Sequence, residues 1–195
     1  MKYVKKMSGE KCYLSPISFD DLPLYTKWVN DMETGIFVLF GADVYDEQKE
    51  LETLKRLTEH NVIMAIVDSK NDSVIGICGL HDRNTVHRSA IFGIYLGDKE
   101  YWGKGFGTEA TGLMLDFAFN VLNLHSVSLE VMDFNQRAKK SYQKCGFSYV
   151  GKKRQAVFIA GQYHDLAIYD ILANEFSSLI VKSLFIKATN ITDSK

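Results

Sequence analysis

The chain of 195 residues has little proline, little cysteine and almost no net charge. Two prolines beside 46% hydrophobic residues argue against a disordered chain. The three cysteines are odd in number and widely spaced, which argues against a disulfide framework or a metal site and fits buried thiols. With 24 acidic and 23 basic residues, the net charge of −1 provides no electrostatic footprint for nucleic acid or an anionic membrane.

Long apolar runs are also missing, because none reaches the roughly 18 residues of a transmembrane helix. The first residues, MKYVKK, lack the apolar core of a signal peptide. We therefore expect a cytoplasmic protein with no nucleic-acid, membrane or metal partner. Length and the absence of a linker predict one domain. The apolar stretch 179–186 is suited to packing or to forming a homodimer, and 190–195 should be frayed.

A glycine-rich segment at 101–110, YWGKGFGTEA, leads directly into a pattern of helical period. Apolar residues recur at the spacing of one buried face from Ala110 to Leu122, so a helix must begin near Gly107. The first turn of a helix has backbone N–H groups without helical partners at the positive end of the macrodipole. Glycines let a ligand approach them closely. The segment is therefore an anion-binding candidate.

Three other interpretations compete for the same glycines. A P-loop fails on spacing, and Gly105 stands where that motif needs a hydroxyl. A dinucleotide fingerprint fits residues 105–110, with Glu130 about 20 residues on as a ribose ligand. However, residues 97–102 separate the preceding strand from the loop, and only 65 residues follow Glu130. A plain strand-to-helix turn is the third alternative.

A second motif lies at 135–147, NQRAKKSYQKCGF. Asn135 and Tyr142 are seven residues apart, so on a helix they share a face about 10 Å apart along the axis. Ala138 lies between them and leaves space. Gly146 is suited to ending the helix.

Together the two motifs resemble those of the GNAT superfamily of acetyl-CoA-dependent N-acetyltransferases. Trp102, Gly105 and Gly107 are similar to its pyrophosphate motif, and 135–147 to its N-x-x-[AS]-x-x-x-Y-x-K-x-G-F signature. The YWGKG form and residues 161–172 are similar to the branch that acetylates ribosomal-protein N-termini and polyamines. The resemblance covers about 11–176, so it implies a domain over these residues with extensions at 1–10 and 177–195. It implies a single-domain α/β (α+β) fold with a mixed, mostly antiparallel sheet of about seven strands, flanked by helices and splayed at the acetyl-CoA site.

The pattern of apolar residues predicts the elements of this fold. Expected strands are 11–17, 62–67, 74–80, 89–96, 127–132, 147–151, 157–160 and 163–172. Expected helices follow Ser18, cover about 47–59, begin near Gly107 and begin at Asn135.

Acetyl-CoA is the co-substrate that the resemblance implies. Its pyrophosphate would bind the amides of Lys104 to Thr108, and its pantetheine arm would pair with an exposed strand edge at 94–96. Asn135 is either a pantetheine ligand or a helix N-cap, and Lys144 either reaches a phosphate or favours the helix C-terminus. The predicted contacts are Ile94, Tyr95, Leu96, Trp102, Gly103, Lys104, Gly105, Phe106, Gly107, Thr108, Asn135 and Lys144.

Tyr142 is the candidate general acid, because a phenol can protonate a departing thiolate of comparable basicity. Related proteins often carry a catalytic Glu where this chain has Ile91. The general base therefore stays open. Candidates are Glu130, His81, Asp82 and His87, alone or through water, and an amine that arrives neutral needs none.

The acceptor pocket is expected between the first two helices and at the last hairpin. Acidic residues beside aromatic rings suit a cationic amine, which selects Asp31, Glu33, Phe37 and Tyr163. The predicted reaction is direct transfer of acetyl to a primary amine, either a small polyamine-like molecule or a protein N-terminus. Two rivals remain: a CoA-binding regulatory module that has lost activity, and a nicotinamide-dependent oxidoreductase.

Overall fold

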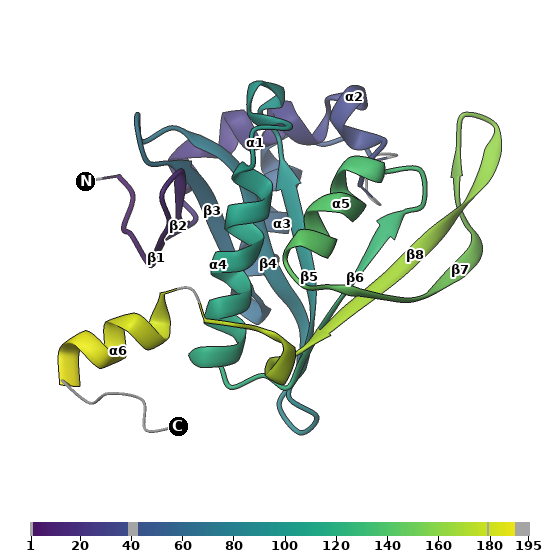
Figure 1. The fold of residues 1–195 in the computed structure, drawn as a ribbon. Coiled ribbons are helices and arrows are strands. Elements are labelled where there is room, and N and C mark those ends of the chain that lie inside the picture. The colour runs from purple at the N-terminus through teal and green to yellow at the C-terminus, as the bar shows by residue number, and fades with distance from the viewer. Residues whose placement is uncertain (1, 39–42, 179, 190–195) are drawn as a thin grey trace.

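The computed structural model describes residues 2–38, 43–178 and 180–189 and folds them around one twisted sheet (Figure 1). The described residues form eight strands in the order β1-β2-β3-β4-β5-β6-β8-β7. All neighbours are antiparallel except β5 and β6. The strands are β1 (Met7–Ser8), β2 (Cys12–Pro16), β3 (Val62–Asp68), β4 (Val74–Asn84), β5 (Ser89–Leu96), β6 (Ser126–Met132), β7 (Ser148–Ile159) and β8 (Gln162–Leu172). The predicted mixed, mostly antiparallel α/β architecture is confirmed.

Helices cover both faces of this sheet. The α-helices are α1 (Leu22–Val29), α2 (Met32–Gly35), α3 (Glu47–His60), α4 (Phe106–Asn120), α5 (Gln136–Lys144) and α6 (Val181–Thr189). Short 3-10 turns occupy Phe19–Asp21, Lys99–Tyr101 and Ala173–Glu175. In Figure 1, α4 and α5 lie in front of the sheet, and α1 and α3 lie behind it.

Side-chain alternation along the strands produces two cores. On β3, Ile66 belongs to the core beneath α4, whereas its neighbours Ala65 and Val67 belong to the core beneath α1 and α3. Successive strand residues point to opposite faces, so a fully apolar strand needs cover on both sides.

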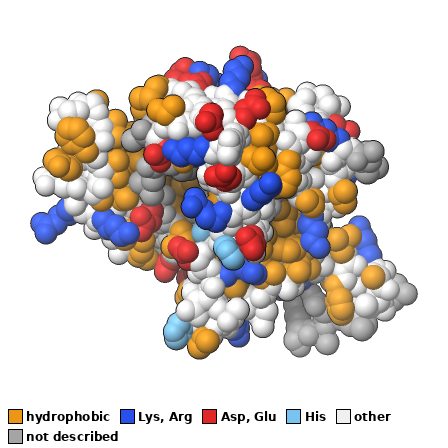
Figure 2. Space-filling view, turned by 180° about the vertical axis from the view of Figure 1, so that it is seen from behind, with side chains coloured by type: hydrophobic (Ala, Val, Ile, Leu, Met, Phe, Trp, Pro, Cys, Tyr) orange, Lys and Arg blue, Asp and Glu red, His pale blue; other side chains and the backbone are white. Residues whose placement is uncertain are grey.

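On the face seen in Figure 2, basic and acidic side chains are interspersed among hydrophobic ones.

Two carboxylates of α4 bind segments near the two ends of the chain. Glu109 accepts backbone N–H bonds from Glu10, Lys11 and Cys12 at 2.9, 2.9 and 2.7 Å, which fixes the β1–β2 turn. Asp116 accepts from Ser178 Oγ and from the amide of Ile180, at 2.8 and 2.7 Å, just before α6. The extension predicted at 1–10 therefore contributes β1, and residues 181–186 of the predicted apolar stretch belong to α6.

The prediction of separate strands at 147–151 and 157–160 was wrong, because β7 is continuous. Residues 152–155, KKRQ, lack apolar alternation since β7 is an edge strand and these side chains are exposed. Its register with β8 shifts between Lys153 and Val157, where Gln155 has φ +51° and its amide bonds Asp165. The short helix α2 was not predicted. The expectation for residues 190–195 lies outside the described residues.

The sheet opens between its two parallel strands. β5 and β6 pair only from Ser89 with Ser126 to Ile91 with Ser128. Beyond Ile91, β5 continues along β4 to Leu96, and β6 continues along β8 to Met132. The splay expected from the resemblance is present at this position.

Candidate active site

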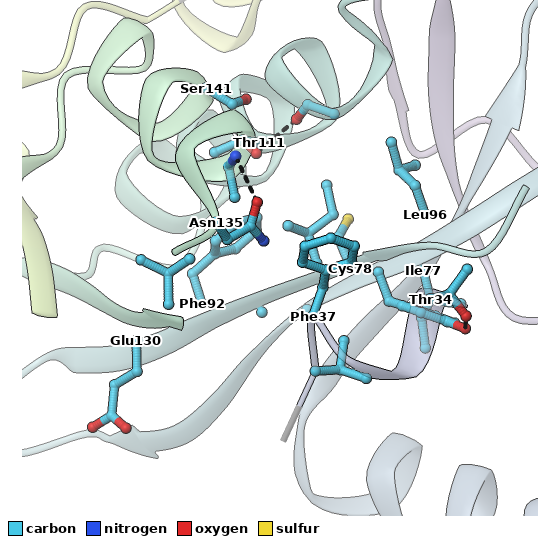
Figure 3. Close-up of a pocket in the computed structure, with 18 of the residues that line it drawn as sticks. Thr34, Phe37, Ile77, Cys78, Phe92, Leu96, Thr111, Glu130, Asn135 and Ser141 are labelled. Carbon is cyan, nitrogen blue, oxygen red and sulfur yellow. Dashed lines mark hydrogen bonds between the residues drawn. The ribbon is translucent and has the colours of Figure 1, made fainter. Parts of the chain in front are cut away.

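A cavity of about 880 Å³ occupies the gap between β5 and β6 (Figure 3). Its walls come from both faces of the sheet: Asn135 and Ser141 from the α5 side, Thr34 from α2, and Glu50 from α3. Figure 3 shows helical residues such as Asn135, Ser141 and Thr111 gathered above the strands that carry Leu96, Ile77 and Cys78. The cavity therefore passes through the sheet.

One end of the cavity is the start of α4. Gly103 and Gly105 adopt φ of +73° and +89°, a left-handed conformation that glycine adopts without steric cost. Gly105 is the N-cap and supplies no side-chain cap, and the first helical bond runs from the Glu109 amide to the Gly105 carbonyl at 3.0 Å. The amides of residues 106–108 therefore precede the helical bonding pattern, so they can bind an anion.

A basic face of α5 lies beside these amides. Lys140 and Lys144 line the cavity together with Thr108, whose hydroxyl is 2.8 Å from that of Ser141. Arg137 is one turn earlier, and its guanidinium stacks 3.8 Å from the centre of the Trp102 ring. Sequence reasoning selected Lys144 and missed Arg137 and Lys140. The spacing i, i+3, i+7 of the three cations was the signal that could have identified this face.

The free edge of β5 forms the middle of the cavity, where Ile94, Tyr95 and Leu96 all contribute to the wall. The Leu96 carbonyl accepts a 2.9 Å hydrogen bond from the Trp102 indole, so this backbone oxygen is already engaged. Of the remaining loop residues, Lys104 is exposed and lies outside the cavity wall. Phe106 packs edge-on against Tyr101 at 4.9 Å and also lies outside the wall.

Tyr142 and Asn135 both line the cavity, as their shared helical face predicts. Tyr142 is 7% exposed and packs edge-on against Phe92 and Phe147. This burial raises the pKa of the Tyr142 phenol, so it is protonated at neutral pH. Asn135 Oδ1 accepts the Ala138 amide at 3.1 Å, so the residue is the N-cap of α5. In Figure 3 its side-chain nitrogen points toward the cavity.

The four candidate bases lie at different positions relative to the cavity. His81 lines the cavity, and a Cβ added at Gly93 would come within 3.1 Å of its Nε2. Burial lowers the pKa of His81, which keeps the imidazole neutral at pH 7. Glu130 lines the cavity and forms an ion pair with Lys153. Asp82 lies at the exposed rim, and His87 lies in the β4–β5 turn outside the cavity wall.

Of the four predicted acceptor residues, one lines the cavity and three lie outside its wall. Phe37 lines the cavity, with its ring centre 5.9 Å from that of Trp102. Asp31 and Glu33 lie outside the wall, and both bind Lys99, at 2.9 and 2.6 Å. Tyr163 is 64% exposed at the β7–β8 turn and packs on Phe158 outside the cavity.

Sequence reasoning missed the wall that α1 and α3 contribute. Tyr25, Trp28, Tyr45 and Glu50 line the cavity behind β5. The available signal was Glu50, a charged residue one turn before the buried Leu54 on the inner face of α3.

In residues 2–38, 43–178 and 180–189, no helix is long and apolar enough to cross a bilayer. The same ranges contain no cluster of three or more His, Cys, Asp or Glu side chains that could hold a metal ion.

Comparison with known proteins agrees with this geometry. Residues 11–148 match the family model described as acetyltransferase (GNAT) domain. Spermidine N(1)-acetyltransferase of Vibrio cholerae is 34% identical over 144 residues, which cover 73% of this chain and 83% of that protein. Putative ribosomal N-acetyltransferase YdaF of Bacillus subtilis is 32% identical over 152 residues, covering 75% and 82%.

A solved structure shares the fold. The crystal structure of spermidine N-acetyltransferase from Vibrio cholerae in complex with CoA and spermine has a TM-score of 0.76 and 28% identity, covering 86% of this chain and 98% of that one. The glycine segment is therefore that of an acetyltransferase and not of a dinucleotide-binding oxidoreductase. The chain belongs to the GNAT acetyltransferase family and is an acetyl-CoA-dependent N-acetyltransferase.

Proposed function

We propose that this enzyme acetylates a primary amine of a polyamine such as spermidine, which attacks acetyl-CoA directly across the gap between β5 and β6. The observation that carries the proposal is that one continuous cavity has a helix start suited to an anion on one side of the sheet and a carboxylate among aromatic rings on the other. Two spermidine N(1)-acetyltransferases, from Vibrio cholerae and Escherichia coli, are at least 32% identical to the chain.

The residues of the α4 side fit the donor. The amides of 106–108 would bind the pyrophosphate of acetyl-CoA, and Lys140 and Lys144 would add charge to those contacts. The pantetheine arm would follow the free edge of β5, and the side-chain nitrogen of Asn135 would donate to one of its carbonyls. The thioester would then lie in the gap, where a backbone amide of β5 would stabilise the oxyanion.

Chemistry follows from the groups that surround the gap. The amine nitrogen attacks the thioester carbonyl, the carbon–sulfur bond breaks, and the thiolate takes the phenolic proton of Tyr142. The apolar surroundings that raise the pKa of Tyr142 also raise the basicity of the departing thiolate. The pKa values of the phenol and of the departing thiol therefore stay close to each other. His81, neutral and beside Gly93, accepts the proton that the attacking amine loses, directly or through water.

A thiol-release assay tests the proposal. Purified enzyme with acetyl-CoA is offered spermidine, spermine, n-butylamine and peptides with free N-termini, and released CoA is measured with a thiol reagent. We expect the largest kcat/KM with the polyamines. A preference for peptide N-termini would replace the polyamine with a protein acceptor. If none of the offered acceptors causes release of CoA, the proposal is refuted.

A further inference from the structure

Glu50 is a charged residue at a position where the fold calls for an apolar one. It lies on the inner face of α3, one turn before the buried Leu54, and only 6% of its surface is exposed. Its neighbours on this face, Thr53, Leu54 and Leu57, line the cavity with it. The carboxylate therefore belongs to the cavity wall and not to the solvent-exposed face of the helix.

Glu50 differs from every other buried carboxylate in the described ranges. Its side chain makes no hydrogen bond or ion pair with any described residue, and burial alone raises its pKa. Burying a carboxylate without a partner is costly, so such groups are usually paired or serve a ligand. The other three have partners: Asp21 binds Lys2 and Tyr3, Asp68 accepts from the Lys70 amide, and Asp116 accepts from Ser178.

The surroundings of Glu50 suit a cation. Tyr25, Trp28, Tyr45 and Tyr95 line the same cavity as Glu50. Aromatic faces attract ammonium groups, most strongly where water is excluded. The Tyr25 hydroxyl is buried and has no hydrogen-bond partner among the described residues, which leaves a second polar atom of this wall unsatisfied.

The cationic side chains that line the cavity do not pair with Glu50. Arg56 lines the cavity from an exposed position on α3 and forms no ion pair with Glu50. The cations Arg137, Lys140 and Lys144 come from α5 on the opposite face of the sheet. None of these cations is therefore a partner of the Glu50 carboxylate.

We propose that the carboxylate of Glu50 binds a second ammonium group of the acceptor, remote from the nitrogen that is acetylated. Glu50 thereby selects polyamines over monoamines. This inference rests on the proposed function, since it names the group that distinguishes a polyamine from another primary amine. It assigns Glu50 to specificity and not to the chemical step.

The test compares Glu50→Gln with wild-type enzyme on two amines at saturating acetyl-CoA. Spermidine carries the second ammonium and n-butylamine does not. We expect kcat/KM for spermidine to fall by about 30-fold, mainly through KM, because one partner of a buried charge pair is removed. With n-butylamine kcat/KM should not change. Glu52→Gln, on the exposed side of the same helix, is the matched control and should leave both amines unaffected.

Two results would overturn the proposal: unchanged kinetics with spermidine in Glu50→Gln, or an equal loss with both amines. Thermal unfolding shows whether the variant folds, and removal of an unpaired buried charge should raise its midpoint. Calorimetry of spermidine binding to the CoA-saturated protein separates this proposal from the proposed function. If the wild-type enzyme acetylates no amine, the proposed function fails. Equal spermidine affinities of wild type and Glu50→Gln would then still refute the role of Glu50.

Discussion

Replacing Gly105 with alanine should weaken CoA binding far more than it weakens the fold. Gly105 has φ +89°, and an alanine there costs about 1–2 kcal/mol, of which about 0.4–1 kcal/mol is regained because the unfolded chain is less flexible. The net loss of about 1 kcal/mol lowers the melting temperature by about 2–4 °C in a chain of this size. An added Cβ meets only the Lys11 side chain, 3.6 Å away, so the cost comes from backbone strain and not from a clash.

Relief of that strain would rotate the peptide groups on either side of Gly105 and redirect the amides at the start of α4. Loss of one hydrogen bond to a charged phosphate corresponds to about 1.5–3 kcal/mol, or about 10- to 100-fold in the Kd for CoA. Calorimetric titration with CoA measures this loss, and thermal unfolding measures the stability change.

Gly161 provides the matched control for this experiment. It lies in the β7–β8 turn at φ +78°, and an added Cβ meets nothing within 4 Å. Gly161→Ala should therefore lose similar stability and bind CoA like the wild type. Wild-type CoA affinity in Gly105→Ala, or an equal loss in both variants, would refute the assignment of the α4 start to the pyrophosphate.

Three further predictions address the acid, the candidate base and the anchor of α4. Tyr142→Phe should lower turnover more at neutral than at high pH and leave CoA affinity unchanged, and unaltered turnover would remove Tyr142 from the acid role. Because burial lowers the pKa of His81 below its usual value of about 6.5, acidification from pH 7 to 5 protonates this residue first in the unfolded chain and destabilises the fold. Urea midpoints of His81→Gln should thus fall less with acidification than those of the wild type, and parallel curves would contradict this. Glu109→Gln should cost about 2 kcal/mol, or about 4–8 °C in melting temperature, because the charge that accepts three amides is lost. An unchanged melting temperature would argue against that anchor.

The proposed donor half of the site could be predicted because its residues are contiguous in sequence. The loop at 101–110 and the helix at 135–147 carry their own spacing, and α4 and α5 begin where the glycines and Asn135 indicate. Local rules of capping and periodicity were sufficient there. The place where β5 parts from β6 could be expected only from the resemblance.

The proposed acceptor half of the site could not be predicted because it is assembled from distant segments. Tyr25 and Glu50 belong to different helices, and only the packing of α1 and α3 behind the sheet brings them to one cavity. The predicted Asp31 and Glu33 follow a sound rule, that acids attract amines, but Lys99 is close enough to bind both. Tertiary contacts of this kind leave no spacing signal in the sequence.

The opening between β5 and β6 connects the two faces of the sheet, which are otherwise separated by paired strands. In the proposed reaction, acetyl-CoA reaches this opening from the side of α4 and α5, and the amine reaches it from the side of α1 and α3. Substitutions in α1 or α3 can therefore reshape the amine that is accepted without disturbing the machinery that holds the donor. On this proposal, two short motifs in the sequence specify the donor, whereas the helices on the other face of the sheet specify the acceptor. One scaffold can then serve different amines.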